Sequence, residues 1–473
     1  MTTSAGDARV RQDAAPPAPP TVVPPEPPAP PARKNLIVVV IDTLRRDHLG
    51  LYGYGRPTSP ALDAFAKEAV VFDRCMSTSS WTEPATVSLL SGLYPPRHGC
   101  HEYDVLSPDV EMLAETLHDA GYRTGGVSGN PNASPILGFG QGLDSFYFAG
   151  NEVAREYVDA HKLLNEARKF LAADDGRPFF LWIQLMNVHG PYRAPPEYRN
   201  RFIDGSIIEF KFQNKLWTDI LRHGRLERRA DVRPEHLRDL AARYDGAIAY
   251  TDELLGKFLR GRLAAGGAAN DVMVVVADHG EELFDHGGFG HGVTLHQELL
   301  DVPLLIRRAG GEGGGARISA PVSLVDLPAT LLDLLGLLPA ERGGRFGDGT
   351  TLVPLFHGGT IERDAPLVAQ VNRAKQGRIF LLQQWPLRLV ETDLDYAGRA
   401  GVVELFDLEQ DPHEQHDLAS ADPERTEKLR AALRRQRKAL EAAAFSASKH
   451  VLSDAERKKL DALGYGGEAE QDR

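Results

Sequence analysis

The sequence predicts an α/β fold, with a mainly parallel sheet sandwiched by helices and a small C-terminal antiparallel α+β subdomain. First, short β-branched apolar runs such as Leu36–Ile41 have the length and composition of buried parallel strands. Second, segments of helical period separate these runs, which makes successive βα units and places helices on both faces of one sheet. Third, the pattern changes after about Asp364 to short strands followed by a single charged helix.

The elements follow in chain order. The large sheet is expected to contain strands at 36–41, 179–186, 272–277 and 302–306. Helices are expected at 60–69 after the cap and first-turn proline Ser59-Pro60, at 110–120 before Gly121, at 234–263, and at 324–335 before Gly336. The C-terminal subdomain is expected to have strands at 367–371, 378–383, 387–391 and 403–408, and a helix from 423 to about 444.

These patterns predict four parts in the 473-residue chain: a disordered Pro/Ala-rich tail over 1–33, a catalytic domain over 34–363, a subdomain over 364–445, and a C-terminal helix or tail over 446–473. Proline, alanine and valine alternate from Ala14 to Ala32, as in an extended, unpacked segment. No run approaches the roughly 20 apolar residues of a membrane span, and the first 33 residues lack the apolar core of a signal peptide. The sequence as it stands therefore predicts a cytoplasmic protein, or a periplasmic or secreted one if the N-terminus is incomplete.

The amino-acid composition and net charge indicate which classes of partner the protein can bind. Hydrophobic content of 42% and charged content of 25% are typical of a soluble globular protein. The net charge of −12 argues against a nucleic-acid surface, so any basic cluster that binds a small anionic ester must be local. Cys75 and Cys100 are too few for a disulfide framework, so two unpaired thiols are expected, with one disulfide between them left open. The oligomeric state is left open too.

The most informative segment is Ser80–Gly92. Thr82 is expected at the N-cap of a helix that ends before Gly92. Free N–H groups and the positive end of the helix dipole would attract an anionic ester to the Thr82 oxygen. Taken alone, the segment fits an ordinary capped helix better than an anion site.

Polar residues follow three of the expected strands. Asp42 ends the first, His189 follows the second, and Asp278-His279 follows the third, with His291 shortly after. Ligands of open α/β sheets bind at the carboxyl ends of the strands. We therefore predict a cation site formed by Asp42, Asp278, His279 and Thr82. Two carboxylates and an imidazole favour one divalent Mn²⁺ or Zn²⁺ over Ca²⁺, although Ca²⁺ remains possible.

The same residues suggest catalysis. Threonine is a weak nucleophile near neutral pH, and a bound cation favours its ionised form. His189 and His291 could stabilise the transferring group or protonate the leaving oxygen, or they could be structural. The nearby residues Glu281, Glu282, Asp285 and His286 are expected in a solvated loop.

The chain resembles the sulfatase family of the alkaline phosphatase superfamily from Asn35 to about Leu418. The matching segments are Asn35–Asp42, Leu49–Gly53, Ser80–Pro95, Leu113–Leu117, Ala120–Tyr122, Pro178–Phe180, His189–Tyr192, Tyr244–Asp245, Tyr250–Asp252, Ala277–Glu281, Val322–Pro328, Leu405–Leu408 and Asp411–Pro412. The resemblance implies metal ligation by Asp42, Asp278 and His279, a nucleophile at Thr82, and anion contacts from His189 and His291.

The sequence also departs from the sulfatase pattern. Sulfatases carry Cys or Ser at position 82, which is oxidised to formylglycine, whereas the methyl group on the threonine Cβ prevents that aldehyde from forming. They also carry Arg at the position of Thr86, usually Lys at position 291, a second Asp where Thr43 stands, and more often Asn at the position of His279. A Thr nucleophile with an Asp-His pair looks more like the phosphoester-handling branches, which include nucleotide pyrophosphatases, lipoteichoic acid synthases and phosphoethanolamine transferases.

The first hypothesis is therefore a metal-dependent hydrolase that cleaves a phosphodiester or phosphonate monoester through a covalent Thr82 intermediate. Water can release phosphate from such an intermediate, whereas a Thr-sulfate lacks the second hydroxyl that expels sulfate from formylglycine. The alternatives are a sulfuric ester hydrolase without formylglycine, a head-group transferase, which the lack of a membrane segment disfavours, and a catalytically degenerate binding protein. Arg46 and Arg97 are left open as cations that could reach the site.

Overall fold

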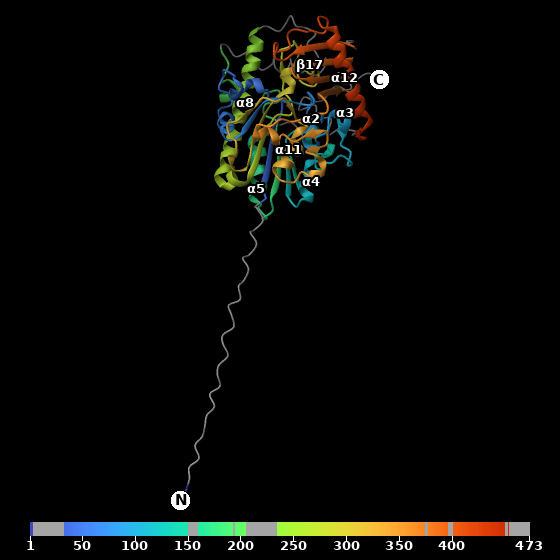
Figure 1. The fold of residues 1–473 in the computed structure, drawn as a ribbon. Helices are drawn as coiled ribbons and strands as arrows, with labels where there is room; N and C mark the ends of the chain where they lie inside the picture. Colours follow the sequence, from blue (N-terminus) through green and yellow to red (C-terminus); the bar gives the residue numbers. More distant parts are fainter. Residues whose placement is uncertain are drawn as a thin grey trace. The chain divides into compact units, whose positions relative to one another are not determined.

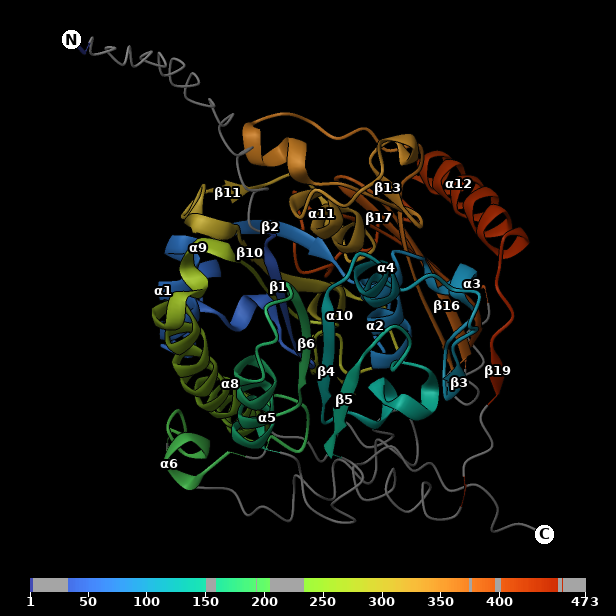
Figure 2. The same cartoon turned by 90° about the horizontal axis from the view of Figure 1, so that it is seen from below.

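A nine-stranded mixed sheet forms the centre of the structure (Figures 1 and 2). The computed structural model describes residues 1–2, 33–149, 159–192, 194–204, 234–373, 377–395, 401–449 and 453. The strand order is β11-β2-β10-β7-β1-β6-β4-β5, and β12 also pairs with β2. The strands are β1 Asn35–Ile41, β2 Val70–Met76, β4 Arg123–Ser128, β5 Ser145–Phe148, β6 Phe179–Leu185, β7 Asp271–Val276, β10 Asp301–Arg307, β11 Arg317–Ile318 and β12 Val322–Ser323.

The central strand β1 lies between β6 and β7 and is parallel to both. Leu36 is paired with Phe180 on one side and Val272 on the other. Its apolar residues from Leu36 to Ile41 are at most 1% exposed, which explains why β1 reads as a continuous hydrophobic run. Strand β10 runs antiparallel to both of its neighbours, β7 and β2, so the predicted sheet is mainly rather than wholly parallel.

Helices cover both faces of this sheet (Figure 2). The helices α1, α5 and α8 lie on one side, and α2, α4 and α11 lie on the other. The helices are α1 Pro60–Phe65, α2 Thr82–Ser91, α3 Pro95–His98, α4 Leu113–Asp119, α5 Ala160–Ala172, α6 Pro196–Arg199, α8 Pro234–Arg262, α9 Ala268–Asn270, α10 Gln297–Leu300 and α11 Asp326–Leu334. Small strands lie between them: β3 Asp104–Val105, β8 Glu282–Leu283, β9 Phe289–Gly290, β13 Arg345–Phe346, β14 Gly349–Thr350 and β19 Ser448–Lys449.

The C-terminal part is an antiparallel four-stranded meander, as the sequence predicts. Its strands are β15 Leu367–Arg373, β16 Gly377–Gln384, β17 Leu387–Asp395 and β18 Val403–Asp407, and helix α12 spans Pro423–Ala442. Leu429 and Leu433 of α12 pack in one hydrophobic cluster with Phe380 and Leu389 of the sheet. The described residues from Arg33 onward fall in one compact unit, and the division at 363/364 stays a prediction.

Several expected elements begin or end elsewhere. Helix α2 begins at Thr82 with Trp81 as its N-cap, so the N-cap prediction for Thr82 was wrong by one residue, whereas the end before Gly92 is confirmed. Helix α4 begins at Leu113 rather than at 110, because the Glu115 carboxylate accepts from the Met112 backbone N–H. Helix α1 ends at Phe65 and continues only as a 3₁₀ turn, Ala66–Glu68.

Strands β2, β4 and β5 were not predicted. In β4, Gly125 and Gly126 interrupt the apolar run, yet the packing requires them, since a Cβ at Gly125 would overlap the Phe170 ring. Cys75 and Cys100 are buried and unpaired, as expected. The predicted tail over 1–33 and the predicted C-terminal segment over 446–473 lie almost wholly outside the described residues.

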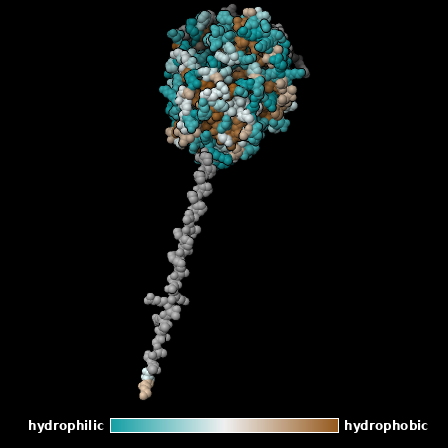
Figure 3. All heavy atoms as spheres, viewed as in Figure 1, coloured by the Kyte–Doolittle hydropathy of each residue, from teal (hydrophilic) through white to brown (hydrophobic). Residues whose placement is uncertain are grey.

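The face drawn in Figure 3 is mostly hydrophilic, with hydrophobic residues scattered singly over it. Within the compact unit, Ile136 is the one large apolar side chain that is strongly exposed among the residues described. A search of the described helices for one long and apolar enough to cross a membrane finds none.

We predict that Gly92→Ala destabilises the fold more than Gly176→Ala. Both glycines have positive φ, 70° and 79°, so each substitution places alanine in the left-handed region at a cost of about 1–2 kcal/mol. Only at Gly92 would the new Cβ also lie 2.6 Å from a carbonyl oxygen, that of Phe346, whereas nothing lies within 4 Å at Gly176. Overpacking should add about 1–3 kcal/mol to the loss in unfolding free energy in urea. Equal losses in the two variants would contradict this account.

Candidate active site

The carboxyl ends of adjacent parallel strands bring three predicted ligands together. Asp42 follows β1, and Asp278 and His279 follow β7. All three side chains are fully buried, and their ligand atoms lie within 4.8 Å of one another. The Nε2 atom of His279 lies 3.9 Å from Asp42 Oδ1 and 4.0 Å from Asp278 Oδ2.

The predicted nucleophile lies beside this cluster. Thr82 Oγ1 is 3.3 Å from His279 Nε2 and 3.4 Å from Asn130 Nδ2. Because Thr82 is the first residue of α2, its hydroxyl lies at the positive end of that helix. The structure therefore brings together Asp42, Asp278, His279 and Thr82.

The hydrogen bonds of His279 leave one ring nitrogen available to a ligand. Its Nδ1 lies 2.9 Å from the Gly280 carbonyl oxygen, so Nδ1 carries the proton and donates it. The lone pair of Nε2 then faces the two carboxylates and the Thr82 hydroxyl. A carbonyl that fixes the tautomer in this way is a common partner of a metal-binding histidine.

The two carboxylates lie close together in a buried site that disfavours their charged forms. Burial, together with repulsion by Asp278, raises the pKa of Asp42 well above its usual value, and burial also raises the pKa of Asp278. Asp42 Oδ1 has no hydrogen-bond partner among the described residues. Buried carboxylates with unused lone pairs fit a divalent cation, which would relieve the repulsion.

Two amide side chains that the sequence analysis missed support the carboxylates. Asn130 donates from Nδ2 to Asp42 Oδ2 as well as facing Thr82. Gln184 donates from Nε2 to Asp278 Oδ2 at 3.1 Å. Asn130 follows β4, a strand that was not predicted because two glycines interrupt its apolar run. Gln184 is a polar residue inside the apolar strand β6, and this signal in the sequence could have identified it.

His189 and His291 also lie at the site. The ring centroids are 4.7 Å apart for His279 and His291 and 4.9 Å apart for His291 and His189. Burial and the neighbouring His291 lower the pKa of His189 to about 3, and burial and His279 hold the pKa of His291 well below its usual value. His189 Nδ1 donates to the Gly190 carbonyl oxygen at 2.7 Å.

The expectation of a solvated loop after His279 was wrong for Glu281 and Glu282, whereas Asp285 is exposed and His286 is half-buried. Glu281 is fully buried, and its Oε1 lies 2.9 Å from His291 Nδ1, while burial raises the pKa of Glu281 to about 7. Glu282 is 3% exposed, and Asp285 forms a 2.7 Å ion pair with buried Arg45. The short hairpin of β8 and β9 folds this segment back over the site, and no local sequence pattern indicates that contact.

The two arginines left open by the sequence have partners elsewhere. Arg46 donates to the Asp73 carbonyl oxygen and lies 3.5 Å from Asp301, and Arg97 pairs with Asp348. A different cation, Arg373 of β15, stacks on Trp81 with 3.7 Å between its Cζ and the ring centroid. Its charge contributes to the lowered pKa of His291.

We predict that Asp278→Asn removes most of the stabilisation by Mn²⁺ without destabilising the metal-free protein. The substitution removes one repelling charge and leaves an oxygen to accept from the backbone N–H groups of Thr43 and His279. Wild type should gain about 2.7 kcal/mol at free Mn²⁺ 100 times its Kd, measured as a rise in Tm after chelation and re-addition. Exposed Asp109→Asn is the control and should behave as wild type. An unchanged Mn²⁺ response in Asp278→Asn would refute the ligand assignment.

Comparisons with known proteins identify the family of the chain. Residues 34–337 match the model of the sulfatase family. An ulvan-active sulfatase of Formosa agariphila is 27% identical over 418 residues, covering 81% of this chain and 76% of that protein. The multifunctional alkaline phosphatase superfamily protein PehA of Trinickia caryophylli is 24% identical over 479 residues, covering 82% and 92%.

A similar fold occurs in solved structures. The phosphonate monoester hydrolase of Agrobacterium radiobacter aligns with a TM-score of 0.67 at 20% identity, covering 89% of this chain and 98% of that one. Because the family model spans well over half of the chain, the protein belongs to the sulfatase family and is an ester hydrolase of the alkaline phosphatase superfamily.

Proposed function

We propose that the protein is a metal-dependent hydrolase that cleaves a phosphodiester or phosphonate monoester through a covalent intermediate on Thr82. The observation that carries this proposal is the position of Thr82 Oγ1, 3.3 Å from His279 Nε2 and beside two buried carboxylates. In this proposal Thr82, His189 and His291 are catalytic, and Asp42, Asp278, His279 and Thr82 hold the metal.

The donor set suits a single divalent ion. Sulfatase-family enzymes bind a divalent metal, and two carboxylates, an imidazole and a hydroxyl suit Mn²⁺ or Zn²⁺ better than Ca²⁺. When bound, the ion supplies positive charge that favours the ionised form of the Thr82 hydroxyl.

In the first step, Thr82 Oγ1 attacks phosphorus and forms a new P–O bond. The bond from phosphorus to the leaving oxygen breaks, and the leaving oxygen keeps the electron pair and takes a proton from an imidazole. We assign this proton to His291, whose Nδ1 is hydrogen-bonded to Glu281, and hydrogen bonding to the phosphoryl oxygens to His189. Both rings are neutral without substrate, and the negative charge of the bound ester favours the protonated form that donates from Nε2. Asn130 orients the attacking hydroxyl through its 3.4 Å contact with Oγ1.

In the second step, water attacks phosphorus and the bond from phosphorus to Thr82 Oγ1 breaks. The imidazole that gave up its proton takes one from the water, which restores the starting state. The positive end of α2 favours the anionic phosphoryl group throughout.

The residue at position 82 favours phosphorus over sulfur. Threonine cannot form the formylglycine aldehyde, and a Thr-sulfate has no second hydroxyl to expel the sulfate. Arg46 and Arg97 pair with carboxyl and carbonyl groups away from the cluster, so a monoanionic diester fits better than a dianionic monoester. The likeness to PehA and to phosphonate monoester hydrolases supports the same reading. A sulfuric ester hydrolase without formylglycine is the second candidate, which the likeness to the ulvan-active sulfatase favours.

We predict that Thr82→Val lowers kcat/KM for an aryl phosphodiester by about 10³-fold or more, because it replaces the nucleophilic hydroxyl with a methyl group of similar size. Thr82→Ser keeps the hydroxyl and should retain most of the activity. Circular dichroism and Tm verify that both variants fold. Activity of Thr82→Val close to wild type would disprove the covalent role.

We also predict a substrate preference. With Mn²⁺ or Zn²⁺ present, aryl phosphodiesters and aryl phosphonate monoesters should give higher kcat/KM than the aryl sulfate with the same leaving group. Wild type and Thr82→Val are compared on all three substrates, so that background hydrolysis is subtracted. A preference for the sulfate would replace the first candidate with the second.

A further inference from the structure

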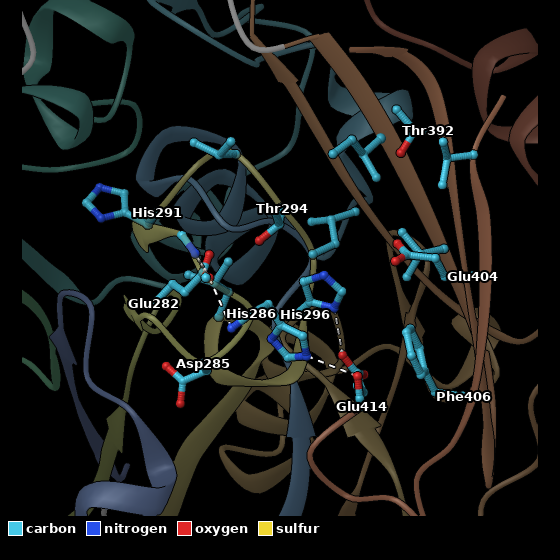
Figure 4. A pocket seen from close by; sticks show the side chains of 18 of the residues that line it. Glu282, Asp285, His286, His291, Thr294, His296, Thr392, Glu404, Phe406 and Glu414 are labelled. Atoms are coloured by element: carbon cyan, nitrogen blue, oxygen red, sulfur yellow. Dashed lines mark hydrogen bonds and ion pairs between the residues drawn. The ribbon is translucent and has the colours of Figure 1, made fainter. Parts of the chain in front are cut away.

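A second group of metal-type donors lies outside the Thr82 site. His286, His296 and Glu414 each offer one ligand atom, and these atoms lie within 4.8 Å of one another. They line a cavity of about 410 Å³ (Figure 4). His286 lies in the turn between β8 and β9, His296 directly precedes α10, and Glu414 follows β18 in the C-terminal part.

The contacts within this group pair each imidazole with a carboxylate. His286 Nδ1 lies 3.0 Å from Glu298 Oε1, and His296 Nδ1 lies 3.1 Å from Glu414 Oε2. Figure 4 shows the two imidazoles side by side above Glu414, with ring centroids 3.8 Å apart. The second nitrogen of His286, Nε2, lies 3.1 Å from the Glu414 carbonyl oxygen.

Negative charge is concentrated around the two imidazoles. Glu298 and Glu414 are 1% and 2% exposed, and Glu282, at 3%, also lies at the cavity. Arg388 donates to the other oxygen of Glu414 at 2.8 Å, and the backbone N–H of Gln297 donates to Oε2 at 3.0 Å. Glu298 Oε2 is buried and has no hydrogen-bond partner within the described part of the chain. The group therefore offers imidazole nitrogens and carboxylate oxygens, and one of these oxygens has no hydrogen-bond partner.

We propose that this cluster is a second metal site, which binds a borderline divalent ion such as Zn²⁺ through His286, His296 and Glu414, with Glu298 as a further oxygen donor. Two imidazoles and a glutamate are a donor set that suits Zn²⁺. Ligands at 2.0–2.1 Å in a tetrahedral site are about 3.3 Å apart, close to the 3.0 and 3.1 Å between the paired nitrogen and oxygen atoms.

The ion would take the place of the protons now shared by these pairs. Binding therefore releases protons. An imidazole binds a metal in the plane of its ring, so the two rings, now stacked with 11° between their planes, must turn apart to share one ion. The cavity beside them provides the space for that rotation.

Such an ion would join the two parts of the molecule. Glu414 belongs to the C-terminal part, whereas His286 and His296 flank the loop that carries His291. The site is structural in this proposal, and it does not depend on the reaction proposed for Thr82.

The test is metal stoichiometry and Zn²⁺ titration calorimetry on the full chain after chelation, in mildly alkaline buffer. Wild type should bind two ions per chain, and Asp278→Asn should keep one. His286→Asn and His296→Gln should each lose one ion and weaken the affinity at that site more than about 100-fold, since even outer-shell partners contribute 10–100-fold. His416→Asn, an exposed histidine two residues from Glu414, is the control and should bind two.

A second readout covers the case in which a variant folds poorly. Co²⁺ added to Asp278→Asn should give the visible absorption of a four-coordinate ion with imidazole ligands, and Zn²⁺ should abolish it. If wild type binds one ion that Asp278→Asn removes, or if His296→Gln binds as many ions as wild type, the proposal fails. The proposal is supported if both histidine variants lose the second ion and keep the hydrolase activity of wild type under Mn²⁺.

Discussion

The structure depends on the charge of two carboxylates that parallel strands force together. Asp42 and Asp278 end the adjacent strands β1 and β7, and both are fully buried. Amide and backbone N–H groups satisfy some of their oxygens but supply no full positive charge. The polypeptide alone therefore leaves these two buried carboxylates without a full positive charge beside them, which the proposed cation would supply. The position of the proposed nucleophile and the orientation of His279 toward the two carboxylates are consistent with such a site.

Side chains from distant parts of the chain support the two carboxylates and the neighbouring imidazole of His291. Asn130 comes from β4, Gln184 from β6, and Glu281 from the segment that the β8–β9 hairpin folds inward. Each acts through a residue at the centre: Asn130 on Asp42, Gln184 on Asp278, and Glu281 on His291. The site is thus built from strand ends, whose positions the sheet fixes, and from supporting side chains whose positions depend on tertiary contacts.

This difference explains which residues of the site could be predicted from the sequence and which could not. Asp42, Asp278 and His279 were predicted because each follows a strand with an obvious apolar run, and parallel strands bring their ends to one edge. Asn130 was missed because Gly125 and Gly126 interrupt the apolar run of the preceding strand, so that this strand was not predicted. Glu281 was misread as solvated, since its burial results from a hairpin contact and not from local periodicity. The position of Arg373 could not be predicted, because it depends on how β15 packs against Trp81.

The C-terminal sheet contacts the segment that leads to Thr82. The backbone N–H of Gln370 in β15 donates to the carbonyl oxygen of Thr78, in the loop that leads to Thr82, and Arg373 of the same strand covers Trp81. Replacing this sheet with that of a relative would therefore change the support of Trp81 and of the loop before Thr82 without altering Asp42, Asp278 or His279. Sequence differences in this sheet among family members would in this way change substrate selectivity without changing the residues of the chemical step.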